Sequence, residues 1–177
     1  MSSPSPSFID ALHSDAPAPD RADRMALYAF LVGDWEMDAV YPLADGSARR
    51  TTGEIHAGWV LEGRALQDVW IVPKRGTRPA DPQLGDFYGT TLRVYDPGLD
   101  AWHILWSDPL KQAYLRQLGR PHGKDIVQEG KAADGALTRW SFREITPKSF
   151  HWIGERSDDA GASWQVQVEF FARRLVK

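Results

Sequence analysis

The chain has 177 residues, no cysteine and a formal charge of -3 at pH 7. The lack of cysteine excludes disulfides, thiolate metal sites and a thiol nucleophile, and the small negative charge argues against a nucleic-acid partner. The length suits one domain that buries its own core. Tryptophan is the unusual residue, with 8 copies against 7 Phe and 5 Tyr. So many indoles need either a thick aromatic core or a cavity with aromatic walls.

The N-terminal segment contains prolines, serines and alanines and has little to bury, which predicts a flexible leader over 1–19. It has neither the basic nor the apolar region of an export signal, and no apolar run is long enough to span a membrane. We therefore expect a soluble, cytoplasmic protein with no membrane partner. No internal repeat appears after the leader, so 20–177 is expected to be a single domain. Whether it forms a homodimer stays open.

Asp20 is the expected N-cap of a short helix over 21–31, which Gly33 ends. From Gly33 onward the hydrophobic period changes to two, which is typical of strands. Separators rich in Gly, Asp and Pro divide the rest of the chain, and the longest of them, 73–85, is expected to form a flap. The alternating runs lie at about 33–41, 49–58, 64–73, 86–95, 101–107, 112–119, 124–131, 136–145, 149–157 and 163–175.

About ten short strands at near-regular spacing, preceded by one helix, predict an all-β fold. The sheet is expected to be an up-and-down antiparallel one that closes into a barrel, since closure removes its exposed edges.

In most runs one parity collects the large apolar side chains, which we expect to face inward. The same parity also carries polar groups inward: Asp68 shares a face with Trp70, and Arg116 lies between Tyr114 and Leu118. A buried Asp or Arg must meet the other, water or a ligand, because a lone buried charge is very costly. The run over 49–58 is ambiguous, with either His56 and its even-numbered neighbours or the odd-numbered residues facing inward.

The segment Gly33-x-Trp35 resembles the opening of calycins, the lipocalin-like barrel superfamily. The resemblance implies that a short helix leads into the first strand, that Trp35 plugs one end of the barrel, and that an arginine of the last strand packs across it. Arg173 and its neighbour Arg174 are the candidates. Further motifs, listed next, resemble an uncharacterised family of bacterial lipocalin-like proteins over about residues 25–175. These motifs are Leu61-Glu62-Gly63-Arg64, Tyr95-Asp96-Pro97 before Trp102, and Arg139-Trp140.

A second motif, Ser157-x-Asp159-x-Gly161-x-Ser163-Trp164, resembles the Asp-box turn of sialidase propellers. The resemblance implies a structural role: Asp159 caps turn amides, Gly161 takes a positive φ and Trp164 packs beneath. The motif occurs once, in a chain too short for a propeller, so it does not indicate a glycosidase.

Heme-binding nitrobindins are also ten-stranded calycins, but the present chain differs from them. Where they continue the opening with two glycines, this chain has Met37 and Ala39, and its last histidine, His151, falls on the outward parity. The usual metal-ligand and phosphate-loop spacings are also absent. We therefore expect neither a metal nor a cofactor, and heme binding is the weaker alternative.

The leading functional hypothesis is the binding of a small apolar or aromatic molecule inside the barrel. The expected ligand-binding residues are Trp70, Tyr88, Trp106, Tyr114, Arg116, Trp140 and Trp152. The alternative is a cofactor-free cyclase, isomerase or hydratase using the same pocket, with His56 and Asp68 as the candidate acid–base pair. A third possibility is a barrel packed solid that serves an interaction role. Whether the protein is an enzyme is left open by the sequence.

Overall fold

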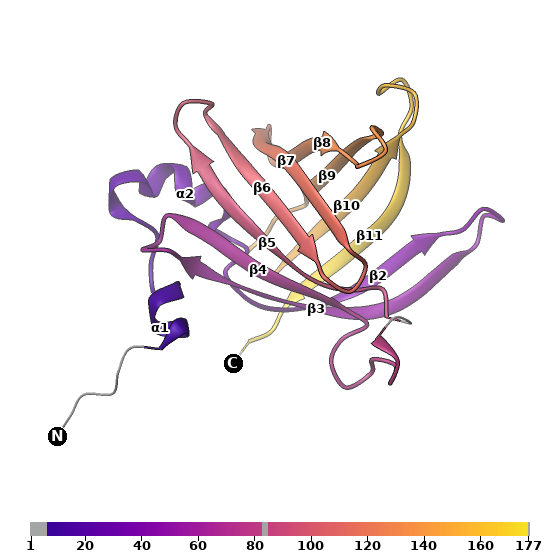
Figure 1. Ribbon diagram of the computed structural model, residues 1–177, viewed down its shortest axis with the longest axis horizontal. Coiled ribbons are helices and arrows are strands. Elements are labelled where there is room, and N and C mark those ends of the chain that lie inside the picture. The colour runs from indigo at the N-terminus through magenta and orange to yellow at the C-terminus, as the bar shows by residue number, and fades with distance from the viewer. Residues whose placement is uncertain (1–6, 83–84, 177) are drawn as a thin grey trace.

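The computed structural model describes residues 7–82 and 85–176, which form a closed antiparallel β-barrel with a short helix at one end (Figure 1). The strands of the barrel are β2 (Gly33–Pro42), β3 (Ala48–Val60), β4 (Ala65–Val72), β5 (Phe87–Asp96), β6 (Ala101–Asp108), β7 (Ala113–His122), β8 (Asp125–Lys131), β9 (Leu137–Arg143), β10 (Ser149–Ser157) and β11 (Gln165–Arg174). Each run of alternating residues has thus become one strand. The predicted ten-stranded barrel is confirmed.

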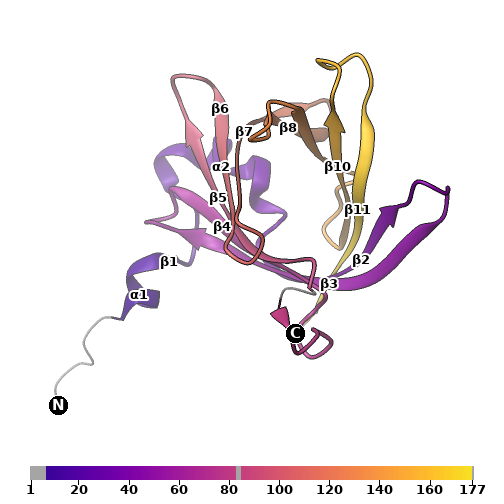
Figure 2. The same ribbon diagram turned by 45° about the vertical axis from the view of Figure 1, so that its right-hand side comes forward.

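Every strand pairs with its neighbours in the sequence, and the barrel closes where β11 pairs with β2, from Glu169 opposite Val40 to Arg174 opposite Trp35. The β2–β3 hairpin extends beyond the neighbouring strands (Figures 1 and 2). The largest boundary difference from the prediction is at the end of β7. Strand β7 continues to His122, opposite Asp125 of β8, so the chain turns later than its Pro-x-Gly sequence suggested.

The N-terminal part contains α1 (Phe8–Leu12), the two-residue strand β1 (His13–Ser14), the 3-10 turn η1 (Pro19–Arg21) and α2 (Ala22–Ala29). Strand β1 pairs with Trp59 and Val60, the last two residues of β3. These residues extend past Ala57, which pairs with the first residue of β2. Residues 1–6 of the predicted leader lie outside the described residues. Neither α-helix in the described part of the chain is long and apolar enough to cross a membrane.

The predicted N-cap at Asp20 is wrong. Asp20 lies inside η1, and its carboxylate accepts a hydrogen bond from Arg64 at 3.1 Å, while Arg21 occupies the N-cap position of α2 without a side-chain cap. The physical reason is that the 3-10 turn comes first, so the chain enters α2 one residue later than the Asp-based signal predicts.

Helix α2 lies across one end of the barrel, behind the strands in the view of Figure 2. It buries Met25 and Tyr28 completely, and Tyr28 contacts Trp102 edge-on at 4.9 Å between ring centroids. Burial raises the pKa of Tyr28, so its hydroxyl stays protonated and donates to Gln128 Oε1 at 3.0 Å. Removing these apolar surfaces from water is the main stabilising contribution at this end.

Trp35 completes the closed end, as the calycin resemblance implies. Its ring is fully buried against Phe150, and its indole nitrogen donates to the Leu31 carbonyl at 2.8 Å. The Arg174 guanidinium lies 4.1 Å from the centroid of the Trp35 ring and donates to the carbonyls of Val32 and Phe30.

Position 33, beside the contact between Arg174 and Trp35, favours glycine. Gly33 has φ of +124°, and a Cβ there would lie 2.5 Å from Arg174 Nη1. Arg173, the candidate favoured from the sequence, is not the packing arginine: it points outward and pairs with Asp38 at 2.7 Å. Adjacent residues of a strand face opposite sides of the sheet, so only one of the two arginines can reach Trp35.

The hairpin turn between β10 and β11 is the expected Asp-box turn. Asp159 accepts hydrogen bonds from the Ser163 backbone nitrogen and hydroxyl, at 2.8 and 2.6 Å, and Gly161 has φ of +94°. The Trp164 ring lies on the outside of the barrel under the Arg139 guanidinium, 3.9 Å from its centroid. The turn therefore fixes the hairpin by local hydrogen bonds and leaves the barrel interior untouched.

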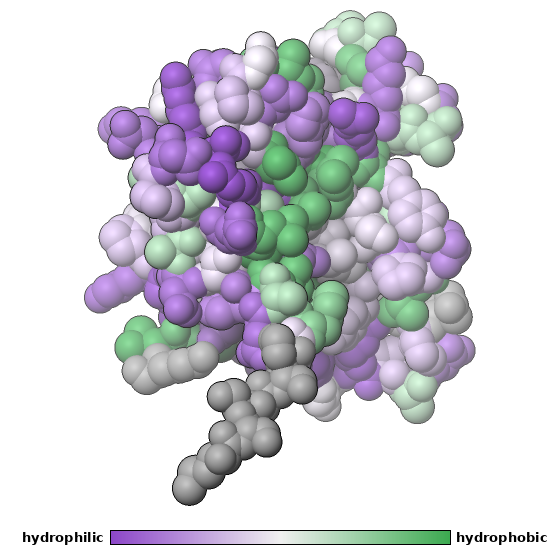
Figure 3. All heavy atoms as spheres, turned by 60° about the vertical axis from the view of Figure 1, so that its left-hand side comes forward, coloured by the Kyte–Doolittle hydropathy of each residue, from purple (hydrophilic) through white to green (hydrophobic). Residues whose placement is uncertain are grey.

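On the face seen in Figure 3, hydrophobic side chains gather in a band between hydrophilic regions. The large hydrophobic side chains that are most exposed include Phe8 and Ile9 of α1.

Candidate functional site

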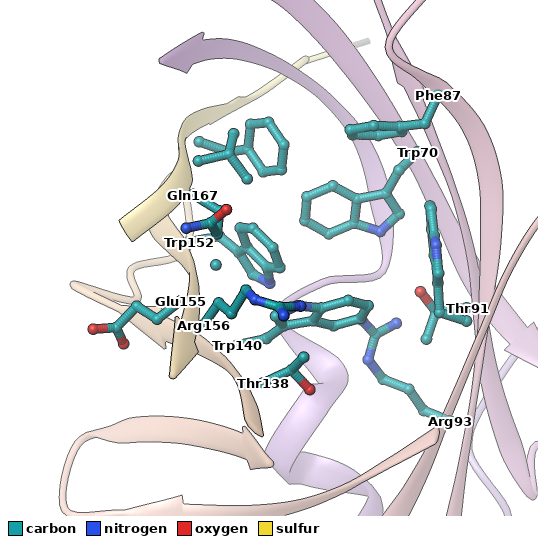
Figure 4. A pocket seen from close by; sticks show the side chains of 14 residues that line it. Trp70, Phe87, Thr91, Arg93, Thr138, Trp140, Trp152, Glu155, Arg156 and Gln167 are labelled. Carbon is teal, nitrogen blue, oxygen red and sulfur yellow. The ribbon is translucent and has the colours of Figure 1, made fainter. Parts of the chain in front are cut away.

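The end of the barrel away from Trp35 contains a cavity of about 350 Å³ (Figure 4). Strands β4, β5, β6, β9, β10 and β11 supply its walls. Its aromatic lining consists of Trp70, Phe87, Trp106, Trp140, Trp152 and Phe170, and its polar lining of Thr91, Arg93, Thr138, Glu155, Arg156 and Gln167. The barrel interior is therefore not filled by its own side chains.

Five of the aromatic rings form a closed circuit of contacts. Going round, Trp106 contacts Trp140 at 6.1 Å between centroids, Trp140 contacts Trp152 at 5.5 Å, and Trp152 stacks on Phe170 at 5.0 Å. Phe170 contacts Phe87 at 5.9 Å, and Phe87 returns to Trp106 at 5.8 Å. Most of these pairs are edge-on or tilted, the arrangements that aromatic rings prefer. The rings support one another around the cavity and leave its middle open.

The ring of Trp106 packs directly against the backbone of a glycine. Gly89 of β5 pairs with Trp70 of β4, and any Cβ at position 89 would collide with the six-membered ring of Trp106. A glycine inside a strand normally weakens it. Here it makes room for the indole that forms part of the wall.

Arg93, one of the residues that line the cavity, belongs to a buried ion pair. Arg93 of β5 is 1% exposed and Asp68 of β4 is also 1% exposed, and an Nη of Arg93 contacts the Asp68 carboxylate. The other oxygen of Asp68 accepts from the Thr91 backbone nitrogen at 3.2 Å. Burial lowers the pKa of Arg93 to about 10, so the guanidinium remains protonated at neutral pH. The pair satisfies the requirement that an inward Asp must find a cation.

A β-bulge shapes the opposite side. The pairing of β10 with β11 shifts between Gly154 and Glu155, so the regular alternation is interrupted there, and three consecutive residues of β10, 154–156, border the cavity. Glu155 accepts two hydrogen bonds from Arg139, at 2.9 and 3.0 Å. Arg156 pairs with Asp134 and Asp158, each at 2.7 Å. Both charges at the bulge are therefore already matched.

Four of the predicted ligand-binding residues line the cavity together: Trp70, Trp106, Trp140 and Trp152. Three others were placed on the wrong face. Tyr88 is 38% exposed, Tyr114 is 61% exposed, and Arg116 lies on the outer surface with its guanidinium near His103 Nδ1 at 3.4 Å.

The error has a physical cause in each strand. In β7 the inward residue is Gln117, which is buried and donates to Thr138 Oγ1 at 3.0 Å, while Tyr114 extends over the outer surface. In β5 both parities carry apolar and Thr residues, so the pattern gives no contrast. The inward position of Asp68 could have identified Arg93 as its partner. Asp68 pairs in register with Thr91 of β5, and Arg93 lies two residues further along β5 on the same face.

The candidate acid–base pair of His56 and Asp68 is not brought together. Ile55 faces the core, so His56 lies on the outer face, where its ring nitrogens contact Asp34 at 2.8 Å and Glu54 at 3.3 Å. Arg75, in the segment after β4, also reaches His56 at 2.9 Å. The two candidates thus lie on opposite faces of the barrel wall.

All five histidines belong to the described residues, and none of them lines the cavity. His151 lies on the outer face as predicted, stacked on Phe171 at 4.3 Å and bonded to Glu169 at 3.0 Å. In the same described ranges, no three His, Asp and Glu side chains are grouped so that they could hold a metal ion.

Comparison with known proteins finds similarity in structure only. No family model matches the chain, and no curated protein matches it in sequence. The crystal structure of Rv2717c from M. tuberculosis superposes with a TM-score of 0.60 at 14% identity, covering 90% of this chain and 99% of that one. The S-type phycobiliprotein lyase CPES from Guillardia theta gives a TM-score of 0.57 at 13% identity, covering 86% and 92%. The chain therefore shares the overall fold of these two proteins.

Proposed function

We propose that the protein binds one small, largely aromatic or apolar molecule in the cavity of its barrel. The observation that carries the proposal is the cavity of about 350 Å³ inside a closed circuit of aromatic rings. An apolar cavity of about 150 Å³ holds a benzene ring, so this one has room for a molecule of two or more fused rings. Concave, mostly apolar sites with a few placed polar groups are typical of small-molecule binding.

The similarity to calycin-like barrels supports the same proposal, because lipocalin barrels hold one small ligand in their interior. One of the two similar structures is named a phycobiliprotein lyase, so the fold also serves at least one enzyme, and fold alone does not decide between binding and catalysis.

The acid–base pair expected from the sequence does not support catalysis in this cavity. A cofactor-free cyclase or isomerase needs an acid–base group that reaches the substrate. His56 lies outside the barrel, and Asp68 is occupied by Arg93 and the Thr91 amide. Heme binding has little support, because His151 is held on the outer face by Glu169 and Phe171.

Titration with N-phenyl-1-naphthylamine, a neutral apolar fluorophore, tests the proposal. We expect saturable binding of one molecule per chain, with a rise and blue shift of probe fluorescence and quenching of tryptophan emission. Val168→Trp places an indole in the cavity and should weaken binding at least tenfold. Val166→Trp is the matched control, since Val166 lies on the same strand, is 37% exposed and does not line the cavity.

The control variant should bind like the wild-type protein, and circular dichroism checks that both variants keep the fold. Absence of saturable binding to the wild-type protein would overturn the proposal. So would a folded Val168→Trp variant that binds the probe as tightly as the wild type does.

A further inference from the structure

Among the described residues, two hydrogen-bond donors in the cavity wall have no hydrogen-bond partner. The Nε of Arg93 and the indole nitrogen of Trp70 are both buried and unpaired, in side chains that are 1% and 3% exposed. Buried donors of this kind are uncommon, because leaving one unpaired forfeits the hydrogen bond that it makes to water in the unfolded chain. An unpaired donor in a native structure needs an explanation.

Both donors belong to the cavity. Arg93 and Trp70 line it from adjacent strands, β5 and β4, and both side chains project into it (Figure 4). Neither side chain can supply its own acceptor, since indole and guanidinium nitrogens only donate. The Tyr28 hydroxyl interacts with the Arg93 guanidinium from the closed end, so an acceptor for the unpaired Nε and for the Trp70 indole nitrogen is best supplied by a molecule in the cavity.

We infer that the ligand carries a neutral hydrogen-bond acceptor, such as a ketone or quinone carbonyl, which is bound by Arg93 and Trp70. This inference rests on the proposed binding function and names the ligand class. A carbonyl oxygen has two lone pairs and can accept from two donors. The rest of such a ligand would lie within the circuit of aromatic rings.

Charge matching favours a neutral group over a carboxylate. The positive charge of Arg93 is already matched by Asp68, which also accepts from Thr91. A ligand carboxylate beside Arg93 would therefore add an anion to a cation that is already paired, and burying an unmatched charge is costly. The other arginine that lines the cavity, Arg156, is matched by Asp134 and Asp158. Each arginine among the described lining residues is therefore already paired with a carboxylate.

Three naphthalenes of similar shape test the inference: 2-acetylnaphthalene, the hydrocarbon 2-isopropenylnaphthalene, and 2-naphthoate. Their affinities are measured by displacement of N-phenyl-1-naphthylamine from the wild-type protein. We expect the ketone to bind about tenfold more tightly than the hydrocarbon, because it gains hydrogen bonds from a charged donor and an indole. The carboxylate should bind no more tightly than the hydrocarbon.

Substitutions assign the preference to its donors. Trp70→Phe keeps an aromatic wall but removes the N–H, and Arg93→Lys keeps a cation for Asp68 but removes Nε, so each should reduce the ketone-to-hydrocarbon ratio several-fold. Trp106→Phe is the matched control: its indole nitrogen is not among the unpaired buried atoms. This control should change both affinities alike and keep their ratio.

The outcomes separate this inference from the proposed function. Equal affinities of the wild-type protein for ketone and hydrocarbon, as expected if water alone satisfies the donors, would overturn the inference and leave the cavity as an apolar binding site. Tighter binding of 2-naphthoate than of the ketone would overturn the choice of a neutral group. If none of the three compounds displaces the probe, the inference fails, whereas failure of the probe itself to bind refutes the proposed function. The wild-type comparison stands even if a variant does not fold.

Discussion

The two ends of the barrel use the same residue type for different purposes. At the closed end, Trp35 is fully buried, its nitrogen donates to Leu31, and Phe150 and Arg174 cover its ring. At the cavity end, Trp70 is nearly as buried, yet its nitrogen has no hydrogen-bond partner in the described part of the chain, and its ring lines the cavity. Trp35 and Trp70 therefore differ little in burial but clearly in the hydrogen bonding of the indole N–H.

The two ends differ because a helix covers only the closed end of the barrel. Helix α2 and the residues that follow it lie across the closed end and supply Tyr28, Leu31 and backbone carbonyls to fill the space. No helix among the described residues covers the other end, where the walls come from strands alone. Side chains of a ten-stranded barrel then line the interior without filling it.

The largest expected effect compares indoles from the two ends. Trp35→Ala should lower the free energy of unfolding by about 4 kcal/mol, because it leaves a void among fully packed rings and an unpaired Leu31 carbonyl. Trp106→Ala should lower it by less than about 2 kcal/mol, because that ring is partly exposed and already borders a cavity. Urea denaturation measures both values. Equal losses would show that the two ends are packed alike.

A smaller effect compares the two arginines at the end of β11. Arg174→Ala should lower the free energy of unfolding by about 2 kcal/mol, since it removes hydrogen bonds to two carbonyls and the contact with Trp35. Arg173→Ala should lower it by less than about 0.5 kcal/mol, because its pair with Asp38 is exposed. A larger loss for Arg173 would reverse our assignment of the packing arginine.

The smallest effect concerns the turn that joins two strands of the cavity wall. Hydrogen bonds from Ser163 and Ser157 lower the pKa of Asp159 from its ordinary 3.8 to about 2. Because the pKa is lower in the folded state, the stabilisation is fully present above about pH 4 and is lost as pH falls through 2. Asp159→Asn should therefore lower Tm most at pH 5, and the difference should shrink toward pH 2. A difference independent of pH would argue against a stabilising carboxylate.

Much of the fold was predictable because period-two alternation and turn residues act locally. The ten strands and the helix before Gly33 could be recognised from neighbouring residues, whereas the Trp35 plug and the Asp-box turn were expected from resemblances to known motifs. The candidate site was predictable only where one parity was clearly more apolar. This condition held for Trp70, Trp106, Trp140 and Trp152, which line the cavity. It failed in β5 and β7, where alternation gave weak contrast and Arg93 was missed.

The sequence by itself determined that this is a closed barrel with an excess of indoles. Alternation of apolar and polar residues requires one buried and one solvent-exposed face of the sheet, and closure buries the apolar face. Only the tertiary structure decided what the indoles do. Packing across the barrel depends on which strands become neighbours, and that placed Arg93 beside Asp68 and turned Arg116 outward. It also left the space between Trp106, Trp140 and Trp152 open, because side chains that only line a wide barrel cannot reach its centre.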